Sequence, residues 1–153
     1  MSTQDHRDRV TQLLALMKRG DDAFNDRDLD AMDAVHDPRA VCYVTGSAEP
    51  TTTLPPHRRM IEQFIDAFPD VHVHNDPYDV QFGGGDWVTV ISKITGTFTG
   101  KMTAPDGTLV TPTGKSFELN FSTTCRWNDA GQLTEEYVFW DSALLAHQVG
   151  LTG

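Results

Sequence analysis

Residues 115–127 read KSFELNFSTTCRW, and residues 86–98 read DWVTVISKITGTF. In both stretches apolar side chains alternate with polar ones, which is the pattern of a β-strand with one buried face. The apolar face of the first stretch carries Phe117, Leu119, Phe121, Cys125 and Trp127. Because the period of two continues from Val71 to Trp140, we expect a largely antiparallel sheet over that half of the chain.

The last predicted strand, residues 133–140, has apolar side chains on both faces. Leu133, Tyr137 and Phe139 are expected on one face, and Val138 and Trp140 on the other. Helices are expected to cover one of these faces. A second copy of the chain is expected to cover the other, so the sequence predicts a homodimer.

Helices are predicted before and after these strands in the sequence. Apolar residues recur at helical spacing from Val10 to Phe24, from Leu29 to Val35 and from Met60 to Phe68. The third of these helices is expected to be capped by Thr53 and to stop before Pro69. A final helix is predicted from Ser142 to Val149, with Gly150 as its stop.

The predicted architecture is an α+β fold in one domain, residues 1–153. Three N-terminal helices and a short C-terminal helix are expected to cover a curved antiparallel sheet, leaving an apolar cavity at the open end of a cone. The 12 Lys and Arg residues against 22 Asp and Glu residues give a net charge of −10. This charge disfavours nucleic acid and anionic membrane surfaces as partners.

We next consider sequence signals for export, for a membrane span and for Cys/His metal ligation. Its first residues, MSTQDHRDRV, contain no apolar segment, and no run approaches the 18 apolar residues of a membrane span, so we expect a cytoplasmic protein. Cys42 and Cys125 belong to no Cys/His ligand pattern and are expected to be buried thiols.

Several short motifs follow one another in a characteristic order. They are AFPDVHVH at 67–74, GGGDWV at 83–88, a GxxxG at 96–100, PTG at 112–114 and a closing D…QVG at 141–150. Together they resemble the SnoaL-like family of polyketide cyclases and ester cyclases, and the resemblance covers most of the chain up to Gly150. It implies the cone-shaped nuclear transport factor 2-like fold. It also implies an aldol or related ring closure on an apolar carbonyl compound, without metal or organic cofactor.

The resemblance also indicates where this chain departs from the family. The best-known members use an aspartate on the final strand as acid/base, three residues before the aspartate that opens the last helix. Here that later aspartate matches Asp141, so the acid/base position is Val138, which cannot transfer a proton. A family histidine on the preceding strand falls near Thr123. A hydrolase, an isomerase or a non-catalytic binding protein are therefore the alternatives to a cyclase.

Glu136 is the first candidate for acid/base chemistry. It shares a strand face with Val138 and Trp140, where apolar walls would raise its pKa and suit it to remove a proton next to a carbonyl. The alternative is an ion pair at the rim of the cone with Lys93 or Arg126.

Two further residues are catalytic candidates, each with a structural alternative. Asp141 precedes the final helix and could instead cap it. Tyr43 could hydrogen-bond a substrate oxygen or be an ordinary core tyrosine.

The substrate-binding residues expected around the cavity are His57, Phe64, Phe68, Phe98, Met102, Phe121, Thr123, Val138 and Trp140. His57, beside Arg58 and Arg59, could also meet an anionic substrate group.

His72 and His74 share one strand face near several aspartates. A third ligand at defined spacing is missing from this pair, so we expect no metal site and no cofactor.

Overall fold

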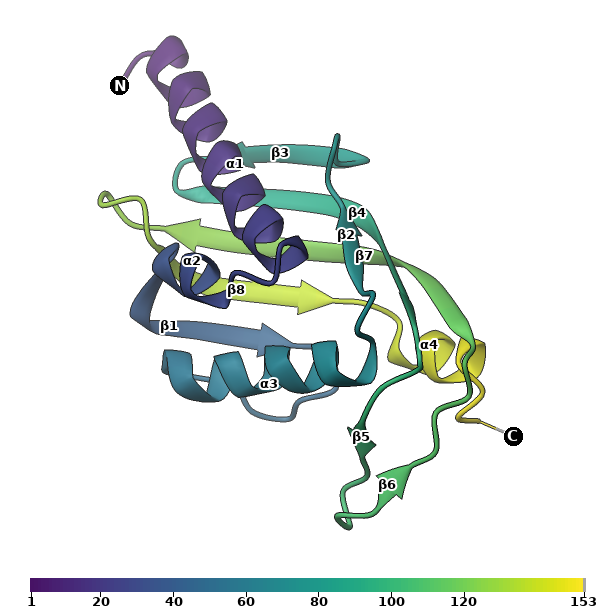
Figure 1. Cartoon of the computed structure of the whole chain (residues 1–153). Helices are drawn as coiled ribbons and strands as arrows, with labels where there is room; N and C mark the ends of the chain where they lie inside the picture. Colours follow the sequence, from purple (N-terminus) through teal and green to yellow (C-terminus); the bar gives the residue numbers. More distant parts are fainter. Residues whose placement is uncertain (153) are drawn as a thin grey trace.

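The computed structural model describes residues 1–152 as a mixed α+β fold in which helices pack on a curved sheet (Figure 1). The helices are α1 (Thr3–Asn25), α2 (Leu29–Ala34), α3 (Leu54–Ala67) and α4 (Ser142–Gln148). The main-sheet strands are β1 (His36–Val44), β2 (His72–His74), β3 (Val80–Gly84), β4 (Trp87–Thr97), β7 (Ser116–Trp127) and β8 (Leu133–Phe139). A separate small hairpin pairs β5 (Met102–Thr103) with β6 (Leu109–Val110).

The sheet has the strand order β1-β8-β7-β4-β2, and β3 pairs with the same edge of β4 as β2. Its centre is the long antiparallel pair β4–β7, which runs from Trp87 opposite Arg126 to Thr97 opposite Ser116. The predicted antiparallel sheet is confirmed except at one edge, where β1 and β8 are parallel. The parallel pairing is possible because α3 and most of the sheet separate β1 from β8 in the sequence.

The predicted alternation in β4 and β7 is confirmed. Val88, Val90 and Ile94 are buried on the inner face of β4, as are Phe117 and Leu119 on β7. The polar residues between them lie on the other face, where Lys93 donates a hydrogen bond to Asn120. This regular pairing makes the inner face an apolar wall.

The predicted face of Leu133 is wrong. The pairing register places Leu133 opposite Trp127 but Glu135 opposite Arg126, so the strand bulges at Thr134. A bulge inserts one residue and moves the side chains before it to the other face. Leu133 is consequently buried with Trp127, at 2% exposure.

Strand β1 includes a proline close to its start. It begins directly after α2 at His36 and contains Pro38. Proline is tolerated there because β1 is an edge strand, where a missing N–H removes no ladder bond from a central position. The register between His36 and Val41 is irregular, as expected where the strand starts at a proline.

The helix boundaries largely confirm the predictions. Thr53 is the N-cap residue of α3, although its side chain makes no capping hydrogen bond, and proline lies in the first turn. The helix ends at Ala67, before Pro69. Gly150 follows α4 with a φ of 77°, a left-handed conformation that favours glycine at a helix end.

The GxxxG motif fixes the end of α3 against the sheet. The amide of Gly100 donates to the Ala67 carbonyl, and the amide of Lys101 donates to the Asp66 carbonyl at 2.8 Å. A Cβ at Gly100 would lie 1.8 Å from that Asp66 oxygen. Glycine is therefore required here by close backbone approach. Among the helices of residues 1–152, none is both long and apolar enough to cross a membrane.

Candidate active site

A cavity of about 280 Å³ lies between the inner face of the sheet and helices α1, α2 and α3. Its walls are mainly apolar and aromatic, and they include Phe64, Phe121 and Trp140. The rings of Phe64 and Phe121 lie about 6 Å from that of Trp140, at 5.9 and 6.1 Å. Concave apolar sites with a few polar groups are typical of small-molecule binding.

The titratable side chains in the cavity lining come from separate elements. They are Asp21 of α1, His36 at the start of β1, His57 in the first turn of α3, and Glu136 of β8. Thr123 of β7 adds a buried hydroxyl without a hydrogen-bond partner among the described residues. The fold thus gathers residues that are far apart in the sequence.

Glu136 is the centre of this group and is 9% exposed. In the sheet it lies between Cys42 of β1 and Cys125 of β7. Its Oε2 is 3.5 Å from Nε2 of His36, and its Oε1 is 4.0 Å from Nε2 of His57. The alternative expectation, an ion pair with Lys93 or Arg126 at the rim, is therefore wrong.

The two histidines reverse the expected pKa of Glu136. Burial alone would raise its pKa, but contact with His36 and the charges of His36 and His57 outweigh burial, so the pKa lies below its ordinary value. Burial would lower the pKa of His36, but the facing Glu136 carboxylate prevails and raises it. The Glu136 carboxylate thus stabilises the protonated form of the His36 ring that it faces.

His57 behaves differently from His36. Burial lowers its pKa and the charge of His36 adds to this, while Glu136 only partly opposes it. His57 is therefore neutral at pH 7. It is 2% exposed, and neither ring nitrogen has a hydrogen-bond partner among the described residues. A neutral imidazole has one donor and one acceptor, so His57 can bind a polar group of a ligand.

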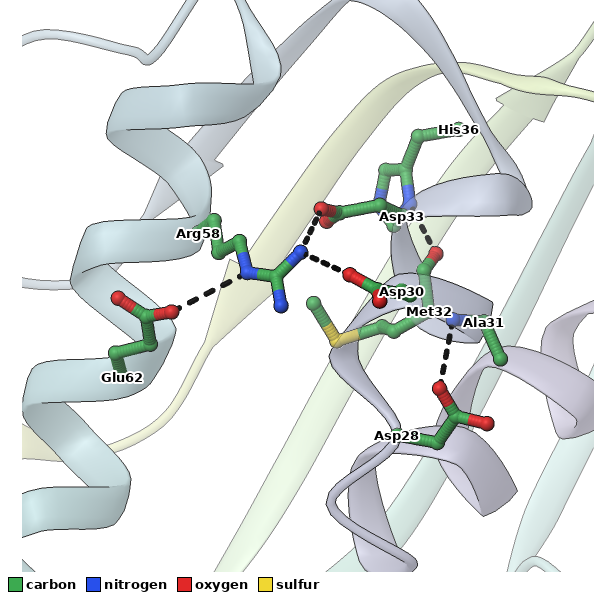
Figure 2. A network of polar contacts seen from close by, with 8 residues as sticks. All are labelled: Asp28, Asp30, Ala31, Met32, Asp33, His36, Arg58 and Glu62. Atoms are coloured by element: carbon green, nitrogen blue, oxygen red, sulfur yellow. Dashed lines mark hydrogen bonds and ion pairs between the residues drawn. The ribbon is translucent and has the colours of Figure 1, made fainter.

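A network of hydrogen bonds and ion pairs between α2 and α3 surrounds His36 (Figure 2). Nδ1 of His36 donates to the Met32 carbonyl at 2.9 Å, so in the protonated ring the second N–H, at Nε2, faces Glu136. The guanidinium of Arg58 bonds to Asp30, Asp33 and Glu62, at 2.6, 3.0 and 3.2 Å. Arg58 is thus committed to carboxylates of the protein and is not available, beside His57, to an anionic substrate group.

Asp21 is a site residue that the sequence reasoning missed. The Tyr78 hydroxyl donates a 2.6 Å hydrogen bond to its Oδ2. Burial raises the pKa of Asp21 to about 7, the Tyr78 bond lowers it in part, and the charge of Glu136 raises it further. One signal was available: Asp21 falls four residues after Met17, on the apolar stripe of α1, where a carboxylate is out of place.

The predicted substrate-binding residues divide into two sets. Those in the cavity lining are His57, Phe64, Phe121, Thr123, Val138 and Trp140. Phe68, Phe98 and Met102 are not in the lining but belong to the adjoining core, where Phe68 and Phe98 are buried and Met102 packs against them. The period of two predicts which face of the sheet a side chain lies on, but it does not predict where along the strand the cavity ends.

Asp141 and Tyr43 lie outside the cavity lining. Asp141 caps α4, and its carboxylate accepts a 2.9 Å hydrogen bond from the Leu144 amide. Tyr43 is 38% exposed on the outer face of the sheet and stacks on Tyr137 with ring centroids 4.7 Å apart. The register places Tyr43 beside Tyr137 on the outer face, while its neighbour Cys42 lies beside Glu136 on the inner face.

One group among residues 1–152 could hold a metal ion. The ligand atoms of His36, Cys42, His57 and Glu136 lie within 4.8 Å of one another. These are types of ligand that zinc accepts. Burial and the Glu136 charge raise the pKa of Cys42, so this thiol is protonated at neutral pH, and Glu136 already faces the His36 ring. His72 and His74 lie exposed on β2, where His74 bonds to Thr95.

Comparisons with known proteins agree with this architecture. A family model described as "SnoaL-like polyketide cyclase" matches residues 14–149. The fold is similar to that of a SnoaL-like protein from Jannaschia sp. CCS1, with a TM-score of 0.79, 18% identity and coverage of 94% of both chains. No match was found among curated protein sequences.

Two Streptomyces proteins have similar folds. AclR from Streptomyces galilaeus has a TM-score of 0.77 and 20% identity, over 93% of this chain and 83% of AclR. IdmH from Streptomyces antibioticus has a TM-score of 0.73 and 23% identity, over 91% of this chain and 99% of IdmH. At these identities the likeness concerns the fold.

Proposed function

We propose that this chain, which belongs to the SnoaL-like polyketide cyclase family and has its nuclear transport factor 2-like cone fold, is a cyclase-type enzyme for a hydrophobic carbonyl compound. The proposed chemistry is the removal of a proton from the carbon next to a carbonyl, followed by ring closure. Neither a metal nor an organic cofactor takes part in the proposed reaction.

The observation that carries this proposal is the ionised carboxylate of Glu136 within an apolar cavity. Because its pKa is lowered, Glu136 is in its basic form throughout the neutral range. It replaces the family aspartate, whose position is Val138, two residues further along the same strand face. His57, with free ring nitrogens, can donate a hydrogen bond to the substrate oxygen.

The second candidate is a binding protein without catalysis, and Val138 is the observation that favours it. A hydrolase or isomerase in the same cavity is a further alternative, since a carboxylate and a histidine can also activate water. Product analysis by chromatography with mass spectrometry separates these functions. A hydrolase adds the mass of water, a cyclase or isomerase gives a product of unchanged mass that elutes at a different time, and a binding protein returns its ligand unchanged.

Proton removal can be tested without knowing the natural substrate. The probe is 2-tetralone, a bicyclic ketone of 11 heavy atoms, whose exchange of carbon-bound hydrogen for deuterium in D₂O is followed by NMR. We expect the protein to accelerate exchange, and Glu136→Gln to slow it about 100-fold or more, in the range of general base catalysis.

Glu135→Gln is the matched control, because Glu135 neighbours Glu136 but faces outward and accepts the Tyr137 hydroxyl. This variant should exchange 2-tetralone like the wild type, and EDTA should leave the rate unchanged. Circular dichroism verifies that each variant is folded. Equal rates for Glu136→Gln and wild type would contradict the proposal.

We also propose that the protein is a homodimer. The support is an aromatic cluster on the outer face of the sheet, which we call the outer aromatic face. It consists of Tyr43, Trp87, Tyr137 and Phe139, whose neighbouring rings lie 4.7 to 6.5 Å apart. Phe139 is 55% exposed, and contiguous exposed apolar groups of this kind are typical of protein interfaces.

A further inference from the structure

Asp21 lines the same cavity as Glu136 but comes from a different element. Asp21 belongs to α1, whereas Glu136 belongs to β8 in the sheet below (Figure 1). Proton removal by Glu136, as proposed above, leaves Asp21 without a role. A carboxyl group in an apolar cavity is costly unless it is paired or protonated, so its presence calls for an explanation.

The surroundings of Asp21 favour the protonated form. Its Oδ2 accepts the Tyr78 hydroxyl at 2.6 Å, and its Oδ1 makes no hydrogen bond with any described residue. Lys18, the cation that acts on Asp21, instead pairs with Asp22 at 3.0 Å. Three charged groups act on Asp21. Lys18 attracts its negative charge only weakly, whereas the carboxylates of Asp22 and Glu136 repel it.

We propose that Asp21 is a second catalytic residue, which donates a proton to the carbonyl oxygen of the substrate while Glu136 removes one from the adjacent carbon. This inference rests on the proposed function and deepens it. When two carboxyl groups of one cavity have pKa values pushed apart, the higher one serves as the acid and the lower one as the base. Here the pKa of Asp21 is about 7, and that of Glu136 is below its ordinary value.

The proton transfers balance within the cavity. The carboxylate of Glu136 takes the carbon-bound proton, and the electrons of that C–H bond form the C=C bond of an enol. The C=O π electrons move to oxygen, which takes the proton of Asp21. Glu136 ends protonated and Asp21 ionised. In ring closure the enol carbon bonds to the carbon of a second carbonyl group, whose oxygen takes the proton of Glu136, while the enol oxygen returns its proton to Asp21. In the exchange of hydrogen for deuterium, the carbon instead takes back a solvent-exchanged proton from Glu136.

This division of roles predicts the substrate class. The substrate is a neutral ketone with hydrogen on the adjacent carbon, because two carboxyl groups in the cavity disfavour an anionic compound. The cavity of about 280 Å³ suits a compact bicyclic ketone. Tyr78 is a positioning residue in this account, since it holds Oδ2 and touches no reacting atom.

The test uses 2-tetralone with two readouts, the exchange rate and the binding affinity, each measured from pH 5 to 9. In the wild type we expect both to fall as pH rises through about 7, because ionised Asp21 cannot donate to the carbonyl. Asp21→Asn should slow exchange about 100-fold at pH 6 and should show no loss near pH 7 in either readout. Tetralin, which lacks the carbonyl, should bind equally at all pH values.

Tyr78→Phe supplies a result that a structural role for Asp21 would not produce. The Tyr78 hydrogen bond lowers the pKa of Asp21, so removing it should move the loss of activity to higher pH. Asp21→Asn that keeps the wild-type loss near pH 7 would overturn the role of Asp21 and leave the proposed function intact. Failure of the wild type to bind or exchange 2-tetralone would instead count against the proposed function.

Discussion

Asp21 and Glu136 show how opposite environments act on the same functional group. Burial dominates at Asp21 and raises its pKa to about 7, whereas the histidines outweigh burial at Glu136 and lower its pKa. The strand period placed Glu136 on the inner face correctly. It could not predict this electrostatic environment, because His36 and His57 come from segments whose approach to β8 leaves no periodic signal.

Because its pKa is raised, Asp21 lowers the stability of the folded state at high pH. Below pH 3.8, its ordinary pKa, Asp21 is neutral in both the folded and unfolded states. As pH rises toward 7, the unfolded chain ionises first, so the folded state becomes progressively less stable. Each unit of pKa shift corresponds to about 1.4 kcal/mol, and the partial exposure of Asp21 reduces the total.

We therefore expect Asp21→Asn to raise the free energy of unfolding at pH 8 by about 2 kcal/mol relative to its effect at pH 4. The asparagine side chain oxygen can still accept the Tyr78 hydroxyl. Urea denaturation of both proteins at the two pH values measures the difference. A variant that is equally destabilised at pH 4 and pH 8 would show that Asp21 titrates normally.

At the scale of elements, the helices and the central strands could be predicted because each has a regular period and ordinary end signals. The bulge at Thr134 and the parallel edge pair β1–β8 could not, because both depend on how distant strands align. These two features bear directly on the site. The bulge brings Leu133 into the cavity lining, and the register of β1 on β8, with Tyr43 beside Tyr137, leaves Tyr43 outside it.

The junction between α3 and the loop after β4 should be sensitive to one added methyl group. Gly100→Ala would drive a Cβ into the Asp66 carbonyl, a backbone atom that cannot move aside cheaply. We expect the free energy of unfolding to fall by about 3 kcal/mol, the upper range for overpacking. Gly84→Ala is the control, since a Cβ there meets nothing within 4 Å. Similar melting temperatures for both variants would argue against this close approach.

At the scale of the whole molecule, the two faces of the sheet differ in what they present. Its inner face encloses the cavity, and its outer face carries exposed aromatic side chains from β1, β4 and β8. The sequence predicted two covered faces of the last strand, and the structure shows helices over only one of them. The composition alone, with a net charge of −10, could not locate this outer surface.

The proposed homodimer gives a direct prediction of mass. Light scattering after size exclusion should report about 34 kDa, twice the 17.0 kDa of one chain. Phe139→Asp places a charge in the outer aromatic face and should yield the single chain mass. Leu109→Asp, at a residue that is 68% exposed on the β5–β6 hairpin, should leave the dimer unchanged. A wild-type mass of 17 kDa at micromolar concentration would exclude the dimer.

The most direct measurement is a crystal structure of the protein grown with 2-tetralone at pH 6, since the whole functional account depends on where a carbonyl compound binds. We predict electron density for the two rings against Phe64, Phe121 and Trp140, with the carbonyl oxygen within hydrogen-bond distance of Asp21. The carbon next to the carbonyl should face Glu136. Density for the compound only outside the cavity, or a cavity that stays closed to it at saturating concentration, would contradict the account.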